Sequence, residues 1–161
     1  MLFRSVGPYS VSKGRLVRRW QKLDVTPAMR DEWVSKGSSA ALDVDLLSWS
    51  PAYSKVSGPL PPEDVPTMRL SESAPRVGAV RCWLDVTTAG KVALALNSPE
   101  GLEIWVDGKS VEPAERLSLD LGTGLHVVTF ALNLSRRREG IRCELEDVAG
   151  SAARAQWVGG K

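Results

Sequence analysis

The sequence predicts an all-β protein, an antiparallel β-sandwich of the jelly-roll type with one short helix near residues 27–36. Between residues 78 and 157, short segments alternate apolar and polar residues, the pattern of strands that bury one face. Turn sequences separate these segments, including Asp107-Gly108 and Gly122-Thr123-Gly124. No helical periodicity interrupts the series, so neighbouring strands are expected to run antiparallel in a sandwich.

The predicted strands follow one another at short intervals. An edge or half-buried strand is expected at residues 16–23, and a further strand around residues 42–47. The later strands are expected at residues 78–87, 91–97, 102–106, 109–111, 117–121, 125–133, 141–145 and 153–157. Residues 125–133 are apolar on both parities, which is typical of a strand in the middle of a sheet.

The predicted helix covers residues 27–36. Thr26 followed by Pro27 is a typical N-cap and first-turn pair, and Gly37 is a natural C-terminal stop. Met29 and Trp33 lie four residues apart, so they share one helical face. We expect that face to pack onto the sandwich.

The length of 161 residues predicts a single domain that covers residues 1–161. Six of the ten prolines fall between residues 51 and 75. We expect this proline-rich segment to be a surface loop, anchored by Tyr53, Val56 and Leu60, rather than a linker between domains. The roughly 50 residues before it contain too few apolar positions for a core of their own.

Charge and hydropathy exclude several classes of partner. The 21 basic and 19 acidic residues leave a net charge of +2, so no nucleic-acid partner is expected. Apolar runs are far shorter than the ~18 residues of a membrane span, and none is expected. The start of the chain lacks the apolar stretch of a secretory signal. The protein is therefore expected to be cytoplasmic, or extracytoplasmic if it is part of a longer exported chain.

Few residues suggest metal or catalytic chemistry. Cys82 and Cys143 are not spaced for zinc and both point inward, as two buried free thiols or as one disulfide. His126 is the single histidine and stands at the head of a strand, where a structural role is expected. Asp107 is expected in the type I′ turn that Gly108 completes. We predict no metal, no cofactor and no enzymatic activity.

Two tryptophans are candidate ligand-binding residues. Trp83 and Trp105 lie on the parity opposite to their apolar neighbours, so both face away from the core of the sandwich. Exposed indoles stack on sugar rings, and Asp85, Glu103 and Asp107 could accept hydrogen bonds from hydroxyls. The alternative is that the proline-rich loop, the helix or another domain covers these indoles.

The basic run Arg136-Arg137-Arg138 stands before Gly140 at a predicted hairpin tip. We expect either a solvated loop or a contact with an anion or an acidic partner.

Several motifs together resemble a known family. Residues 98–109 read SPEGLEIWVDGK and are followed by Leu119-Asp120-Leu121, Gly124-Leu125-His126 and the strand at 141–145. This order resembles PA14-like and related carbohydrate-binding jelly-roll modules, over about residues 97–147. The resemblance implies a sandwich that binds glycans as an accessory domain. In calcium-dependent members acidic residues precede the tryptophan strand, but here Pro99 offers no carboxylate oxygen, so calcium is not expected.

A second resemblance concerns the β-rich terminal segments of large exported bacterial proteins that carry c-type haem elsewhere. The present chain has no Cys-x-x-Cys-His motif, so no haem attachment is implied.

Together these observations predict a non-catalytic binding module that recognises carbohydrate weakly, as an accessory domain of a larger extracytoplasmic bacterial protein. The alternative is a structural or protein-interaction domain whose tryptophans dock on a neighbouring domain or on a second copy of the chain.

Overall fold

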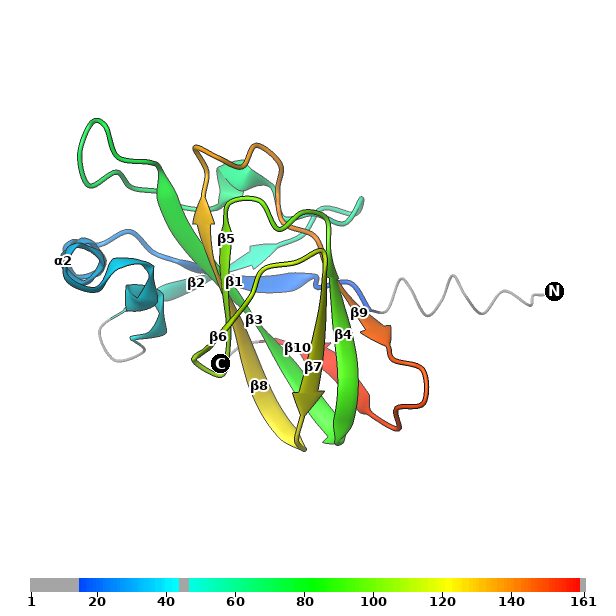
Figure 1. Ribbon diagram of the computed structural model, residues 1–161. Helices are drawn as coiled ribbons and strands as arrows, with labels where there is room; N and C mark the ends of the chain where they lie inside the picture. Colours follow the sequence, from blue (N-terminus) through cyan, green and yellow to red (C-terminus); the bar gives the residue numbers. More distant parts are fainter. Residues whose placement is uncertain (1–14, 44–46, 160–161) are drawn as a thin grey trace.

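The computed structural model describes residues 15–43 and 47–159, and it contains two antiparallel sheets packed face to face (Figure 1). The predicted all-β sandwich is therefore confirmed. The larger sheet has seven strands in the order β2-β1-β3-β8-β5-β6, with β10 also paired to β3, and the smaller sheet has three in the order β7-β4-β9. The larger sheet contains β1 (Arg19–Leu23), β2 (Trp49–Tyr53), β3 (Val77–Thr88), β5 (Leu102–Val106), β6 (Lys109–Val111), β8 (Gly124–Asn133) and β10 (Arg154–Val158). The smaller sheet contains β4 (Gly90–Leu96), β7 (Arg116–Leu121) and β9 (Cys143–Asp147).

Strand β3 is the centre of the larger sheet. One of its edges pairs with β8 from Val77↔Asn133 to Val86↔Gly124. Its other edge is shared, because β1 pairs with the first part of β3 and β10 with the last part. Strand β1 therefore lies between β2 and β3, so the edge alternative is wrong. Its mixture of exposed, intermediate and buried residues matches the half-buried alternative.

The core between the sheets comes from strict alternation along the central strands. The inward residues are each at most 2% exposed and include Val80, Cys82, Leu84, Val86, Val128, Phe130 and Leu132. Cys82 and Cys143 are both buried and free, which matches the free-thiol alternative. Burial raises the pKa of both thiols, so they stay protonated and pack as small apolar groups.

Helix α2 (Pro27–Lys36) has the predicted bounds. The Thr26 hydroxyl oxygen accepts a hydrogen bond of 3.1 Å from the Met29 amide, and Gly37 ends the helix with φ of 71°. Met29 and Trp33 are buried, so the predicted helical face does pack onto the sandwich.

The strand predicted at residues 42–47 is wrong at its start, and residues 44–46 lie outside the described residues. A 3₁₀ helix (Gly37–Leu42) follows α2 instead. Its Ala40 and Ala41 are at most 2% exposed, so they extend the apolar layer that α2 places on the sheet. Burial of these small side chains favours the helical course over an extended one.

The proline-rich segment at residues 51–75 is only partly a loop. Its first residues belong to β2, which tolerates Pro51 because it is the terminal strand of the sheet and pairs on one side only. Further along, a short 3₁₀ helix spans Pro62–Asp64. Leu60 is fully buried and bridges to Ile141, as an anchor should. Tyr53 is 62% exposed and Val56 is 95% exposed, so the prediction that these two are anchors is wrong.

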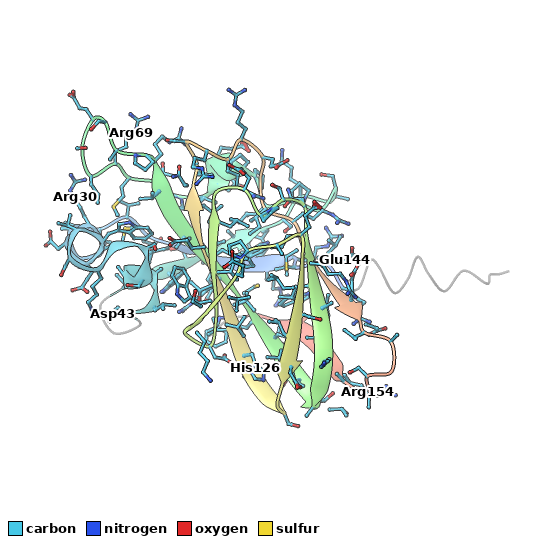
Figure 2. All side chains as sticks on the ribbon, in the orientation of Figure 1. Arg30, Asp43, Arg69, His126, Glu144 and Arg154 are labelled. Carbon is cyan, nitrogen blue, oxygen red and sulfur yellow. The ribbon has the colours of Figure 1, made fainter. Side chains whose placement is uncertain are left out.

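The later part of this segment holds α2 over the sheet. The Arg30 guanidinium donates hydrogen bonds of 2.8 Å to the Arg69 carbonyl and 3.2 Å to the Leu70 carbonyl. Figure 2 shows Arg30 at the helix and Arg69 in the loop that precedes β3. The helix therefore lies against one part of the outer face of the larger sheet.

Candidate functional site

The outer face of the larger sheet is divided into two parts. The first, here called the covered half, consists of Leu23, Ala79, Trp105 and Ala131, which pack against Met29 and Trp33 of α2. Ala79 and Ala131 are direct cross-strand partners, and their small side chains leave room for the helix.

Trp105 belongs to the covered half and is only 8% exposed. The expectation that Trp105 is available to stack on a sugar is therefore not met, and the helix covers this indole. Alternation along β5 sets which side of the sheet Trp105 faces, but it does not determine what lies on that side.

Glu103, the polar neighbour of Trp105, lies at the border of the covered half. It is exposed, and the Ser38 hydroxyl donates a hydrogen bond to its carboxylate. A hollow of about 400 Å³ opens beside it, lined by Trp33, Ser38, Glu100, Glu103, Glu112 and Arg136, among others. Two of the lining residues, Arg136 and Glu100, form an ion pair of 3.0 Å. Glu103 and Trp105 thus lie with the helix, away from Trp83.

The second part of the outer face, here called the open half, consists of Gln21, Trp49, Tyr53, Arg81 and Trp83. Trp49 packs against the apolar cluster that contains the covered half and the buried residues of α2, so it lies at the border between the two parts, whereas Tyr53 and Trp83 are not in that cluster. The Arg81 guanidinium carbon lies 4.1 Å from the centroid of the Trp49 ring and 5.3 Å from that of Trp83. Each such cation–π contact contributes about 0.5–2 kcal/mol, depending on its exposure.

One side-chain amide, that of Gln21, orders Arg81 and Trp83, which with Gln21 and Trp49 form a row of side chains on this face. The Gln21 side-chain oxygen accepts a hydrogen bond of 2.7 Å from Arg81 Nε and one of 2.9 Å from the Trp83 indole N–H. The two donors come from adjacent positions on one face of β3, and Gln21 is the cross-strand partner of Arg81. Because its hydrogen bonds are made within the sheet, the Trp83 indole has a fixed orientation before any ligand arrives.

A second hollow, of about 370 Å³, adjoins this row. Its lining residues are Arg19, Trp20, Gln21, Trp49, Pro51, Tyr53 and Gly159. Gln21 and Trp49 belong to both the row and the hollow, so the two are continuous. Tyr53 is 62% exposed and adds an aromatic ring to this face.

Asp85 shares the face of Trp83, two positions further along β3, and is half-buried. Its cross-strand partner on β8 is Leu125, which is 44% exposed. Of the residues that the sequence singles out for ligand binding, the structure brings Trp83 and Asp85 together. It places Glu103 and Trp105 by the helix and Asp107 in a turn.

Sequence analysis missed Gln21, Trp49 and Arg81. Arg81 has the same parity as Trp83 in the predicted strand, so that signal was present. No sequence signal pointed to Trp49, because β2 overlaps the start of the proline-rich segment and its strand pattern is not recognisable there.

Asp107 has the expected role in a turn. Its φ is 52° and that of Gly108 is 80°, as a type I′ turn requires. One carboxylate oxygen of Asp107 accepts a hydrogen bond of 3.0 Å from the Val127 amide. The other carboxylate oxygen lies 2.5 Å from His126 Nδ1. The second ring nitrogen of His126 lies 2.7 Å from the Gly122 carbonyl oxygen. Figure 2 shows His126 near one end of the sandwich.

Both ring nitrogens of His126 therefore face acceptors, which favours the protonated imidazolium. Burial lowers the pKa of His126, but the hydrogen bonds with Asp107 and with the Gly122 carbonyl outweigh it, and the net shift is upward. The predicted structural role of His126 at the head of its strand agrees with these contacts.

Arg137 is not part of a solvated loop, as the sequence suggested for the basic run. It is 2% exposed and donates to the carbonyls of Ser98, Glu100 and Gly140 and to the Asn97 side chain, at 2.7–2.9 Å. Burial lowers its pKa from the usual value. Arg137 therefore fixes the turn before β5, whereas Arg136 and Arg138 are exposed.

Within residues 15–43 and 47–159, no cluster of three or more histidine, cysteine or acidic side chains is placed to hold a metal ion. In the same part of the chain, no helix has the length and apolar character needed to cross a bilayer.

Comparison with known proteins adds little. No protein-family model matches the chain, and no curated protein matches it. Among solved structures, the chain is similar to a GH31 alpha-xylosidase from Xanthomonas citri, with 23% identity over 54% of the present chain and a TM-score of 0.35. The match spans 11% of that longer chain. At this level the likeness carries no argument, and the PA14-like resemblance stays a prediction.

Proposed function

We propose that the chain is a non-catalytic binding module whose open half recognises a glycan weakly. The observation that carries the proposal is the row of Trp49, Arg81 and Trp83, in which Gln21 accepts hydrogen bonds from Arg81 and Trp83 and the Arg81 guanidinium lies over both indoles. An ordered aromatic surface beside a hollow is the arrangement to which a sugar ring binds with little loss of entropy.

Sugar recognition needs both apolar and polar contacts. The C–H face of a pyranose packs on an indole, and the Trp83 and Trp49 rings offer such surfaces. Asp85 and Tyr53 flank the row and can exchange hydrogen bonds with hydroxyls. Two half-buried indoles provide a small apolar area, so single-site binding is expected to be weak.

Weak binding by a small face is useful when it is repeated or tethered. A long polysaccharide presents many identical rings, and attachment to a larger protein raises the effective concentration of each site. We therefore propose that the chain acts as an accessory domain of a larger extracytoplasmic bacterial protein and itself forms one domain.

Affinity electrophoresis in gels that contain single polysaccharides tests the proposal. We expect retardation by at least one polysaccharide and loss of that retardation in Trp83→Ala. Val34→Ala is the matched control, because Val34 is 65% exposed on α2, away from the open half. Equal retardation of the wild type and of a folded Trp83→Ala variant would contradict the proposal. Release of new reducing ends from a bound polysaccharide would contradict its non-catalytic part.

The second candidate is a protein-interaction domain that uses the same face. Tyr53 and Leu125, which are 62% and 44% exposed, favour it because they add apolar surface beside the row. In that alternative, the purified chain would form dimers by analytical ultracentrifugation, Trp83→Ala would be monomeric, and no polysaccharide would retard either protein.

A further inference from the structure

The Arg81 guanidinium differs from the other well-placed arginines in what surrounds it. Arg137 donates to four oxygen acceptors, and Arg116 forms an ion pair of 3.0 Å with Glu146. Arg81 uses only Nε, which donates to an amide oxygen that Trp83 shares. In the described part of the chain, neither of its terminal Nη groups makes a hydrogen bond or an ion pair.

This charge is also partly removed from water. Arg81 is half-buried between two indoles, and burial lowers its pKa from the usual value. A partly desolvated charge with no counter-ion is destabilising, and a bound anion would relieve that cost. With Nε occupied, the two Nη groups remain as a pair of parallel donors, which matches the two oxygens of a carboxylate.

The adjoining hollow has the same sign of charge. Among the described residues, its lining contains Arg19 and no acidic residue. Asp24, at the end of β1, already accepts hydrogen bonds from the Ser48 and Ser50 hydroxyls. Asp85 lies on the other side of Trp83 along β3, at the border of the open half. Arg81 and Arg19 therefore set a positive potential over the surface where the glycan is proposed to bind.

From this geometry we infer that the open half recognises an acidic polysaccharide built from uronic acid residues. The sugar carboxylate binds to the two Nη groups of Arg81, while the ring of the same or the next sugar packs on Trp83 or Trp49. Arg19 attracts the carboxylate of a neighbouring residue across the hollow. This inference rests on the proposed glycan-binding function and adds the charge class of the ligand.

The test compares each acidic polysaccharide with an uncharged form of the same chain. Polygalacturonate, alginate and hyaluronan are titrated by isothermal calorimetry, and so are their carboxyl-reduced or methyl-esterified forms. We expect binding to at least one acidic chain and a loss of at least about tenfold in affinity when its carboxylates are removed. Arg81→Gln should lose a similar factor, and Arg81→Lys should recover only part of it, because an ammonium lacks the paired donors.

Arg138→Gln is the matched control, because it removes the same charge from an exposed position in the loop after β8. It should leave the affinity within about twofold of the wild type. Thermal unfolding of each variant shows whether the fold is intact. Should Arg81→Gln unfold, the comparison of acidic and neutral polysaccharides with the wild-type chain still decides the question.

The outcomes separate the two proposals. Equal affinity for the acidic and the neutral forms would overturn the acidic-ligand inference and leave glycan binding standing. No binding to any acidic or neutral chain would overturn both. Dextran sulfate serves as a further probe: if it binds as tightly as the best uronic acid chain, and Trp83→Ala has no effect on either, the face attracts charge without recognising a uronic acid.

Discussion

The covered and open halves of the outer face share strands β1 and β3, yet we propose different roles for them. In the covered half, Trp105 is 8% exposed beneath α2, whereas Trp83 in the open half keeps a half-buried indole. The difference lies in the neighbouring side chains. The paired Ala79 and Ala131 leave space for a second layer, and the next residues along β3 on this face, Arg81 and Trp83, are too large to admit one. The helix therefore packs where the sheet side chains are small, beside the larger side chains that we propose for glycan binding.

The largest expected difference between the halves is in stability. Trp105→Ala removes a buried indole from between the sheet and α2, and should lower the free energy of unfolding by about 3–5 kcal/mol. Trp83→Ala should cost about 1–2 kcal/mol, because its ring is only half-buried and contributes one cation–π contact. Urea unfolding followed by circular dichroism measures both, and equal losses would contradict the division of the face.

Larger side chains should also destabilise the covered half more than the open half. Ala131→Leu adds bulk where Ala79 and the helix leave little room, and should destabilise the fold by about 1–3 kcal/mol. Val127→Leu makes a smaller addition on the same face of β8, opposite Trp83, and should change stability by less than about 0.5 kcal/mol. Differential scanning calorimetry compares the two; a tolerated Ala131→Leu would show that the helix is not closely packed on the sheet.

The fold could be predicted well from the sequence, because alternation and turn residues are local signals. Thr26, Pro27 and Gly37 predicted the two ends of helix α2. The alternation of apolar and polar residues predicted which residues of β3 and β8 face inward. Strand β2 could not be seen, because Pro51 breaks its pattern and its pairing with β1 is a long-range contact. The same limit explains Arg137, since its burial depends on carbonyls almost 40 residues away in the sequence.

A third prediction concerns the order within the open half. Gln21→Leu removes the oxygen that holds both Arg81 Nε and the Trp83 indole, at an expected cost of about 1 kcal/mol per hydrogen bond. If the row binds a glycan because it is already ordered, affinity should fall severalfold by calorimetry. Unchanged affinity in a folded Gln21→Leu variant would show that this order is not needed.

The smallest effect is expected outside both halves, at His126. Its pKa in the folded chain is raised from the usual 6.5, so the stabilisation is fully present below the unfolded-state pKa. The stabilisation is lost as the pH rises through the raised value. Urea midpoints measured between pH 5 and pH 9 should fall across that window in the wild type, and the fall should be smaller in His126→Gln. Glycan affinity at pH 6 should be equal in the two proteins, and a loss in the variant would place His126 in the binding face.

Only part of the candidate site could be predicted from the sequence, for a physical reason. Parity placed Trp83, Trp105, Asp85 and Glu103 on the side of their strands opposite to the core between the sheets. The alternating burial of β3 agrees with that side for Trp83 and Asp85, and Trp105 lies on it within the apolar cluster beneath α2. What covers an outward residue depends on tertiary packing. The small residues at positions 79 and 131 indicate where the helix packs on the sheet. They do so only once β3 and β8 are known to be neighbouring strands.

The most direct test of the two-halves account is the set of indole N–H signals in a ¹⁵N–¹H correlation spectrum, since the chain has six tryptophans. Each signal is assigned by a single Trp→Phe substitution and followed as a retained polysaccharide is added. The account predicts that the Trp49 and Trp83 signals shift in a saturable way, while those of Trp33 and Trp105 stay in place. Shifts at Trp33 or Trp105 with none at Trp83 would contradict it.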